Sequence, residues 1–237
     1  MIRKREELRV MREECSPVKA VLYTLHSALS TLFFVVAIML LAAGCGVTAP
    51  DRSDVYDFRL QPENLVFHWP LERRPVKYFA QAIGTAPEYV RDGLTMWEAQ
   101  FLYGEFESSV TTDSAAADVW VILEGGTPPA SPLTSAPAVQ ACTGSTSATL
   151  GGPTRLAGPL LIQVRWFPGF TPADVVNCIS RVTAHEIGHS LGLLQHSGDP
   201  ADLMYGVPSV RAPSIRDRST VQILYHTTAH LTPADRP

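Results

Sequence analysis

Positive charge is scarce in this chain and shows no concentration beyond its first 44 residues. Lysine and arginine number 19 in 237 residues, against 23 aspartates and glutamates, which gives a formal net charge of −4 at pH 7. A nucleic-acid-binding domain typically gathers lysine and arginine into a basic patch that meets the phosphates. The sequence has no such patch after residue 44, so we expect no nucleic acid among its partners.

Glutamate is missing from everything that follows Glu186. One common kind of catalytic zinc site takes two histidines and a glutamate as its three protein ligands. A pair of histidines at 185 and 189 therefore has no later glutamate to complete a site of this kind, and a ligand set of two histidines and a downstream glutamate is excluded.

The strongest chemical signal is an HExxH motif formed by His185, Glu186 and His189. Residues four apart lie on one face of an α-helix, so the two imidazoles converge on one point. Glu186 lies about 100° further round the helix axis and can reach a water beside the metal without being a ligand. Two neutral imidazoles suit Zn²⁺, and a third protein ligand with a water completes a tetrahedral catalytic site.

The third ligand is expected just beyond the end of this helix. Glycine takes the left-handed conformation that ends helices, so the helix should stop at Gly192 and let the chain double back. His196 can then meet the same metal. Asp199 or Asp202 could serve instead as an oxygen ligand, and the residues alone leave this choice open.

The stretch from His185 to Met204 resembles the metzincin metallopeptidases, most closely the matrixin-like branch. Their pattern is H-E-x-x-H-x-x-G-x-x-H, followed by a turn that carries a methionine under the metal. The pattern puts its third histidine at position 195, which is Gln195 here, and the histidine follows as His196. The spacing from His196 to Met204 is similar to that of matrixins, and an imidazole is a better zinc ligand than an amide. The resemblance therefore favours His196.

This resemblance implies a fold and an activity. The expected fold class is α+β: a zincin-like domain over residues 74–230, with a twisted, mainly parallel sheet, an active-site helix and a C-terminal helix. The implied activity is zinc-dependent hydrolysis of protein or peptide substrates, with Glu186 as general base and Met204 as an apolar floor. The wall of the main side-chain pocket is expected at the residues after the methionine, namely Tyr205, Gly206, Val207 and Pro208.

Two rival functions remain open. The chain could be a non-catalytic, zinc-stabilised surface lipoprotein that binds a partner. Glu186 argues against this, because a structural zinc site normally has four protein ligands and needs no neighbouring glutamate. A hydrolase acting on another carbonyl substrate would use the same residues as a peptidase.

Residues 1–44 read as a targeting segment. A basic start leads to an apolar run at about 28–43, then small residues directly before Cys45, as in a secretory signal. These residues resemble the bacterial lipobox, which implies cleavage before Cys45 and its acylation. An uncleaved transmembrane anchor and ordinary secretion are the alternatives, and all three place the domain on the extracytoplasmic side of the cell envelope. Residues 45–73 have no clear period and are expected to form a tether.

Cys142 and Cys178 are the cysteines left in the domain. An oxidising compartment permits them to pair. Cys178 lies seven residues before His185, two turns back on the same helical face. A bridge would tie the preceding loop to the active-site helix, and two free buried thiols are the alternative.

Local patterns place the remaining elements. Thr171, Pro172 and Asp174 fit the start of the active-site helix, and Ser214 with Asp217 resembles a capping box. Strands are expected at 76–80, 117–123 and 160–167, and an amphipathic helix after Pro87. Residues 125–158 are expected to form a long loop, of which 143–152 either borders the substrate cleft or is a plain mobile insertion. His226 and His230 are expected to be surface residues, with a second metal site as the alternative.

Overall fold

The computed structural model describes residues 54–81, 84–126 and 140–236. The expected signal segment and Cys45 lie outside these residues. Among the residues described, no helix has the length and apolar character needed to cross a membrane.

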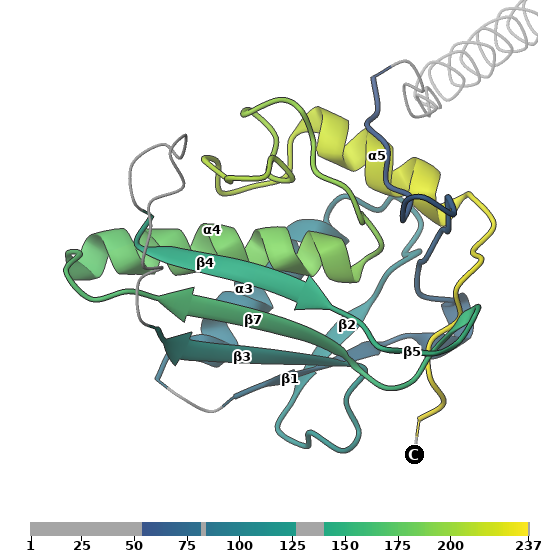
Figure 1. Ribbon diagram of the computed structural model, residues 1–237, viewed down its shortest axis with the longest axis horizontal. Coiled ribbons are helices and arrows are strands. Elements are labelled where there is room, and N and C mark those ends of the chain that lie inside the picture. The colour runs from purple at the N-terminus through teal and green to yellow at the C-terminus, as the bar shows by residue number, and fades with distance from the viewer. Residues whose placement is uncertain (1–53, 82–83, 127–139, 237) are drawn as a thin grey trace, which may run out of the picture. The chain divides into compact units, whose positions relative to one another are not determined.

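A five-stranded sheet forms the centre of the domain (Figure 1). Its order is β2 (Ser108–Thr111), β1 (Val76–Ala80), β3 (Val119–Gly125), β7 (Leu160–Trp166) and β4 (Cys142–Ser147). The first four strands are parallel, and β4 runs antiparallel to β7 at the edge. A second, two-stranded sheet pairs β5 (Leu150–Gly152) with β6 (Arg155–Leu156).

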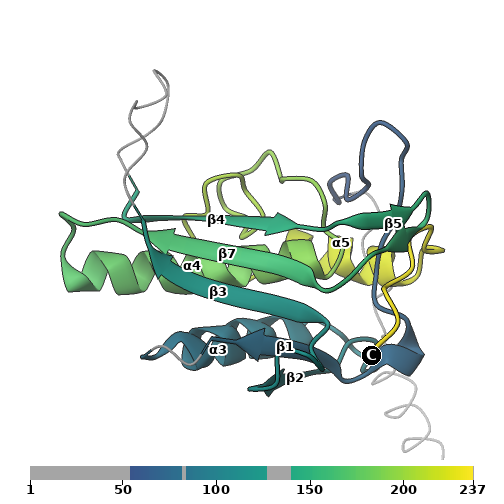
Figure 2. The same ribbon diagram turned by 60° about the horizontal axis from the view of Figure 1, so that its bottom comes forward.

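In the parts of the chain that the structure describes, three α-helices accompany the sheet. Helices α3 (Ala86–Glu98) and α4 (Pro172–Ser190) lie on the same face of it, and α5 (Ile215–Tyr225) follows near the C-terminus (Figure 2). A short 3₁₀ helix, η1 (Leu71–Arg73), precedes β1. This mixed architecture with a mainly parallel sheet confirms the expected fold class.

Several elements lie where local patterns predicted them. Strand β1 has the predicted bounds, and the predicted apolar face of α3 is buried through Val90, Leu94 and Trp97. Strand β3 begins two residues later than predicted. The predicted long loop contains β4, β5 and β6, because serine, threonine and glycine can form an edge strand when a neighbouring strand supplies the pairing.

Residues 54–69, expected to belong to a tether, are part of the folded domain. Phe58, Val66, Phe67 and Trp69 are buried in its core. The Trp69 indole donates a hydrogen bond to the carbonyl of Ser190 at 2.9 Å, at the last residue of α4. The apolar residues of this segment follow no helical or strand period in the sequence. They are held by contacts with distant parts of the chain and not by regular local structure.

Candidate metal centre

Helix α4 carries the HExxH motif, and its ends are set by local chemistry. The Thr171 side chain accepts a hydrogen bond from the backbone N–H of Asp174 at 3.2 Å, and Pro172 occupies the first helical position. At the other end, Gly192 has a φ of 110°. Residues other than glycine rarely adopt such a positive φ. The helix therefore ends before Gly192, as expected, and the chain reverses there.

Buried contacts hold α4 in place. The Trp97 indole of α3 donates to the carbonyl of Ala184 at 2.8 Å, one residue before the motif. A disulfide joins Cys142 of β4 to Cys178 of α4. This is the pairing that the sequence suggested, and it fixes the edge strand against the helix that carries the motif.

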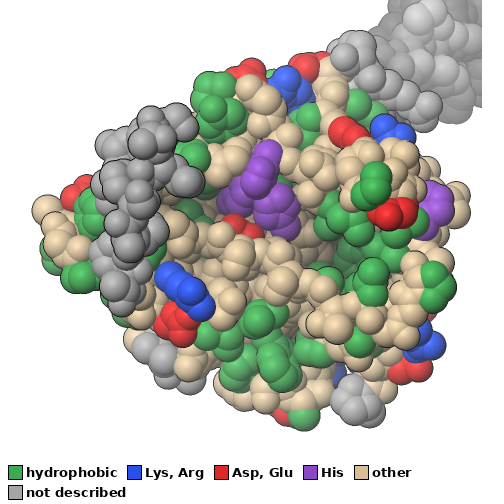
Figure 3. Space-filling model, in the orientation of Figure 1, with side chains coloured by type: hydrophobic (Ala, Val, Ile, Leu, Met, Phe, Trp, Pro, Cys, Tyr) green, Lys and Arg blue, Asp and Glu red, His purple; other side chains and the backbone are tan. Residues whose placement is uncertain are grey.

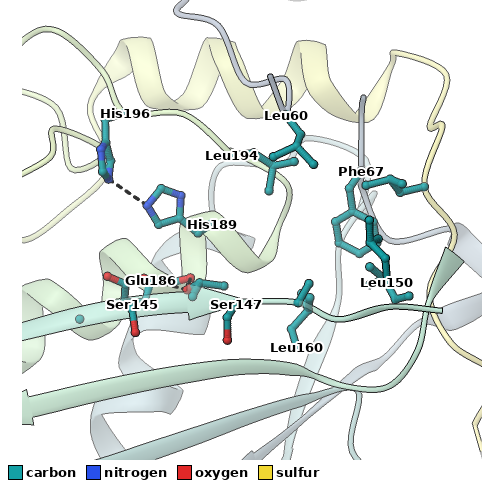
Figure 4. Close-up of a pocket in the computed structure, with 15 residues that line it drawn as sticks. Leu60, Phe67, Ser145, Ser147, Leu150, Leu160, Glu186, His189, Leu194 and His196 are labelled. Atoms are coloured by element: carbon teal, nitrogen blue, oxygen red, sulfur yellow. Dashed lines mark hydrogen bonds between the residues drawn. The ribbon is translucent and has the colours of Figure 1, made fainter. Parts of the chain in front are cut away.

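The structure brings His185, His189 and His196 together. One ring nitrogen from each lies within 4.8 Å of those of the other two, and this is the one such group of potential metal ligands found in the described ranges. The Nε2 atoms of His189 and His196 are 3.2 Å apart (Figure 4). His196 is exposed while His185 is buried, so the group opens to solvent on one side.

The hydrogen bonds of these rings leave the correct nitrogens free for a metal. Nδ1 of His185 lies 2.7 Å from the carbonyl oxygen of Leu203, and Nδ1 of His189 lies 2.5 Å from that of Leu193. Since a carbonyl oxygen can only accept, each Nδ1 carries the proton. Each Nε2 therefore presents a lone pair towards the centre of the group, which is the tautomer that zinc requires.

Burial also keeps the rings neutral. Burial lowers the pKa of His185 to about 4 and that of His189 to about 3, and neighbouring histidines add to both shifts. Partial burial lowers the pKa of His196 as well. Three neutral imidazoles at neutral pH fit a zinc ion without the loss of a proton.

The rival third ligands are engaged elsewhere. The Gln195 amide donates to the carbonyl of Arg59 at 3.1 Å. Asp202 is buried and accepts hydrogen bonds from Ser214 at 2.6 Å and from Arg216 at 2.8 Å. Asp199 also lies near Arg216, with an N–O distance of 3.5 Å. Of the candidates, His196 is the one that reaches His185 and His189.

Within residues 54–81, 84–126 and 140–236, the second histidine pair, His226 and His230, belongs to no group of potential metal ligands. Nδ1 of His230 accepts a hydrogen bond from the backbone N–H of Val66 at 3.1 Å. His226 lies 3.7 Å from a carboxylate oxygen of Glu105. The expectation that His226 and His230 are ordinary surface residues agrees with these contacts.

Met204 lies buried beneath α4. A Cβ added at Gly188 would come within 2.4 Å of the Met204 sulfur, so the two segments touch where the helix has no side chain. The Asp217 carboxylate accepts hydrogen bonds from the backbone N–H groups of Leu203 at 2.8 Å and Met204 at 3.4 Å. Sequence reasoning found Asp217 as a capping residue, which it is, but missed this second role.

Glu186 is buried at the edge of the histidine group. Thr146 of β4 has its hydroxyl 2.7 Å from Oε2 of Glu186 and 3.0 Å from its backbone carbonyl. Burial raises the pKa of Glu186 to about 7, and the Thr146 hydrogen bond opposes this shift. Strand β4 approaches closely because Gly144 has no side chain, and a Cβ there would lie 2.5 Å from a Glu186 oxygen. No local sequence signal indicated Thr146 or Gly144.

A cavity of about 520 Å³ opens beside Glu186, His189 and His196. Figure 3 shows histidine side chains at a hollow in the surface, with hydrophobic side chains further along it. Its lining includes residues of the 143–152 region, which therefore borders the cavity. The residues expected to wall the main side-chain pocket are not among those that line this cavity, so their role stays a prediction: Tyr205, Gly206, Val207 and Pro208.

Comparison with known protein families agrees with this site. The family model described as Matrixin, Peptidase_M10, matches residues 86–226, which is more than half of the chain. No curated protein matches the chain. The matched region contains the three histidines, Glu186 and Met204. With its mainly parallel sheet, its HExxH helix and a third histidine that completes a site fit for zinc, the chain belongs to the matrixin family of metallopeptidases.

Proposed function

We propose that this matrixin is an active zinc endopeptidase that hydrolyses extracytoplasmic proteins, with His185, His189 and His196 as zinc ligands and Glu186 as general base. The observation that carries the proposal is the position of Glu186. Its carboxylate lines the same cavity as His189 and His196 and is hydrogen-bonded to Thr146. A site that served only to stabilise the fold would need no such group.

The protein's own residues supply the positions and the proton transfers. Bound zinc would supply Lewis acidity, which makes water more acidic and polarises the carbonyl that is attacked. Glu186 takes the proton from the attacking water and delivers it to the leaving amine. With a pKa raised to about 7 by burial, its carboxyl is suited to both steps near neutral pH. Thr146 keeps the carboxylate aimed into the cavity.

Strand β4 is suited to hold an extended peptide. It is the edge of the five-stranded sheet, so one side of its backbone has no partner strand among the described residues. Peptides bind such edges by adding a strand through main-chain hydrogen bonds. Because β4 also carries Thr146, a peptide on this edge would pass beside Glu186.

The disulfide supports an extracytoplasmic location. Disulfides persist in oxidising compartments and are rare in the cytosol, and Cys142 and Cys178 are bonded here. Together with the expected targeting segment, this supports a protein anchored to the membrane through Cys45, with extracytoplasmic proteins as substrates.

Removing the metal tests the function. The full chain in detergent, loaded with zinc, should cleave a mixed peptide library, and new termini read by mass spectrometry should mark defined sites. A chelator should reduce cleavage to background, and added zinc should restore it. The reason is that the proposed mechanism depends on the bound ion to make the attacking water more acidic. A protein that binds zinc tightly and cleaves nothing would instead be a zinc-stabilised binding protein.

Replacing Thr146 with valine should slow peptide hydrolysis by about tenfold or more, because a hydrogen bond to a charged group is lost while the shape is kept. Zinc content should be unchanged, since Thr146 touches none of the histidines in the hydrogen bonds described. Thr146→Ser, which keeps the hydroxyl, should retain most of the rate. Equal rates for the valine and serine variants would show that Thr146 does not position Glu186.

A further inference from the structure

The cavity beside Glu186 continues away from the histidines into an apolar chamber. Its far walls are formed by large hydrophobic side chains, among them Leu60, Phe67, Leu150, Leu160, Leu194 and Leu231 (Figure 4). Apart from the site histidines, Glu186 is the one ionisable residue in the lining. A peptide that reached Glu186 would therefore meet a mainly hydrophobic surface next to the point of cleavage, with Ser145, Thr146 and Ser147 of β4 as its uncharged polar part.

Backbone hydrogen bonds hold the chamber walls. The N–H of Leu194 donates to the carbonyl of Phe58 at 3.0 Å. Phe67 forms a parallel bridge with Leu231, and the N–H of Leu156 donates to the carbonyl of Thr232 at 3.0 Å. Four distant segments of the chain thus meet around this space. The chamber is a built feature of the domain and not a gap between side chains.

Three of these walls come from outside the region that matches the matrixin family. Leu60 and Phe67 precede residue 86, and Leu231 follows residue 226. The segment 54–69, which carries the first two, is anchored through the buried Trp69 and its hydrogen bond to Ser190. The chamber therefore depends on parts of this chain that the family match does not cover.

The size and lining of the chamber define what it can hold. The whole cavity, of which the chamber is the apolar part, has a volume of about 520 Å³, within the range of roughly 300–1,000 Å³ typical of ligand sites. Apolar walls favour an apolar occupant, because its burial removes hydrophobic surface from water on both sides. A charged or strongly polar side chain would lose its hydration there and find few partners.

We propose that this chamber selects substrates by a large apolar side chain, leucine-like or phenylalanine-like, on the N-terminal side of the cleaved bond. The inference rests on the proposed peptidase function. The chamber lies at the carboxyl end of β4, where Ser145 to Ala148 contribute to its lining. Antiparallel pairing, the more stable arrangement, places the N-terminal part of a bound peptide at that end of the strand.

Two matched peptides test the proposal on the zinc-loaded full chain. Both peptides contain the same mapped cleavage site. They differ at one position on the N-terminal side of the cleaved bond, which is leucine in one peptide and serine in the other. This position is the one at which a peptide library shows the strongest preference. The wild type should cleave the leucine peptide with a kcat/KM about tenfold to a hundredfold higher. Leu150→Asp, on a wall residue that is 48% exposed, should lose most of this preference, because the leucine peptide should be cleaved more slowly relative to the serine peptide than by the wild type. Leu102→Ser is the control, because Leu102 is 59% exposed and lies outside the chamber.

Three outcomes would overturn the proposal. The first is that the wild type shows no preference for an apolar residue on the N-terminal side of the cleaved bond. The second is that Leu150→Asp leaves such a preference intact. The third is that Leu150→Asp instead removes a preference on the C-terminal side. If no protein cleaves either peptide, the peptidase function fails, and fluorescence polarisation of the labelled peptides still tests the chamber. Tighter binding of the leucine peptide that weakens in Leu150→Asp but not in Leu102→Ser would support it, and equal binding of both peptides would refute it.

Discussion

A chain carrying Glu186→Gln is expected to hydrolyse peptides about a hundredfold to ten-thousandfold more slowly than the wild type, with zinc still bound. Glutamine has nearly the same shape as glutamate and keeps a hydrogen-bond acceptor for Thr146, so the fold and the cavity should persist. It cannot take a proton from water, so the proton transfers assigned to Glu186 are lost. The rate of cleavage of one mapped peptide and the zinc content of the same sample are the two measurements.

Controls separate a lost base from a damaged site. Glu63→Gln removes a carboxylate from an exposed position and should leave the rate unchanged. His196→Ala should lose both zinc and activity, because it removes one of the three imidazoles. If Glu186→Gln cleaved as fast as Glu63→Gln, the general base would have to be another group, and the assignment of Glu186 would be wrong.

The group of three histidines could be predicted because its geometry follows from spacing along a short stretch. His185 and His189 share a face of one helix, and Gly192 turns the chain so that His196 follows within a few residues. The capping box of Ser214 and Asp217 was equally local, since its two residues are three apart and bond each other. In such cases the distance along the chain limits the distance in space, and the sequence alone carries the geometry.

The surroundings of the centre depend on contacts that no local pattern encodes. Thr146 meets Glu186 across 40 positions of the chain, in a strand of weak hydrophobic pattern whose place is set by pairing with β7. Tyr56 donates a hydrogen bond to Asp217 at 2.8 Å across 161 positions. That bond helps to explain why a segment read as a tether is part of the fold. Its apolar and aromatic residues gain their partners only when the rest of the domain has formed.

Gly192→Ala is expected to destabilise the protein by about 3 kcal/mol or more, from backbone strain of roughly 1–3 kcal/mol and overpacking of a similar size. The φ of 110° at this position is strained for any residue with a side chain. An added Cβ would also lie 1.8 Å from the carbonyl oxygen of Phe67. Since small domains are stable by only about 5–15 kcal/mol, the variant should unfold at clearly lower denaturant concentration or fail to fold.

Gly198→Ala is the matched control, six residues further along the same loop. A Cβ there would meet no atom within 4 Å, so its unfolding free energy should change by no more than about 1 kcal/mol. Urea unfolding of both variants, followed by tryptophan fluorescence, measures the difference directly. A Gly192→Ala protein as stable as Gly198→Ala would mean that segment 54–69 can move away from the turn at little cost. The wall that Leu60 and Phe67 form would then be free to shift, and a fixed chamber could no longer be the basis of substrate selection.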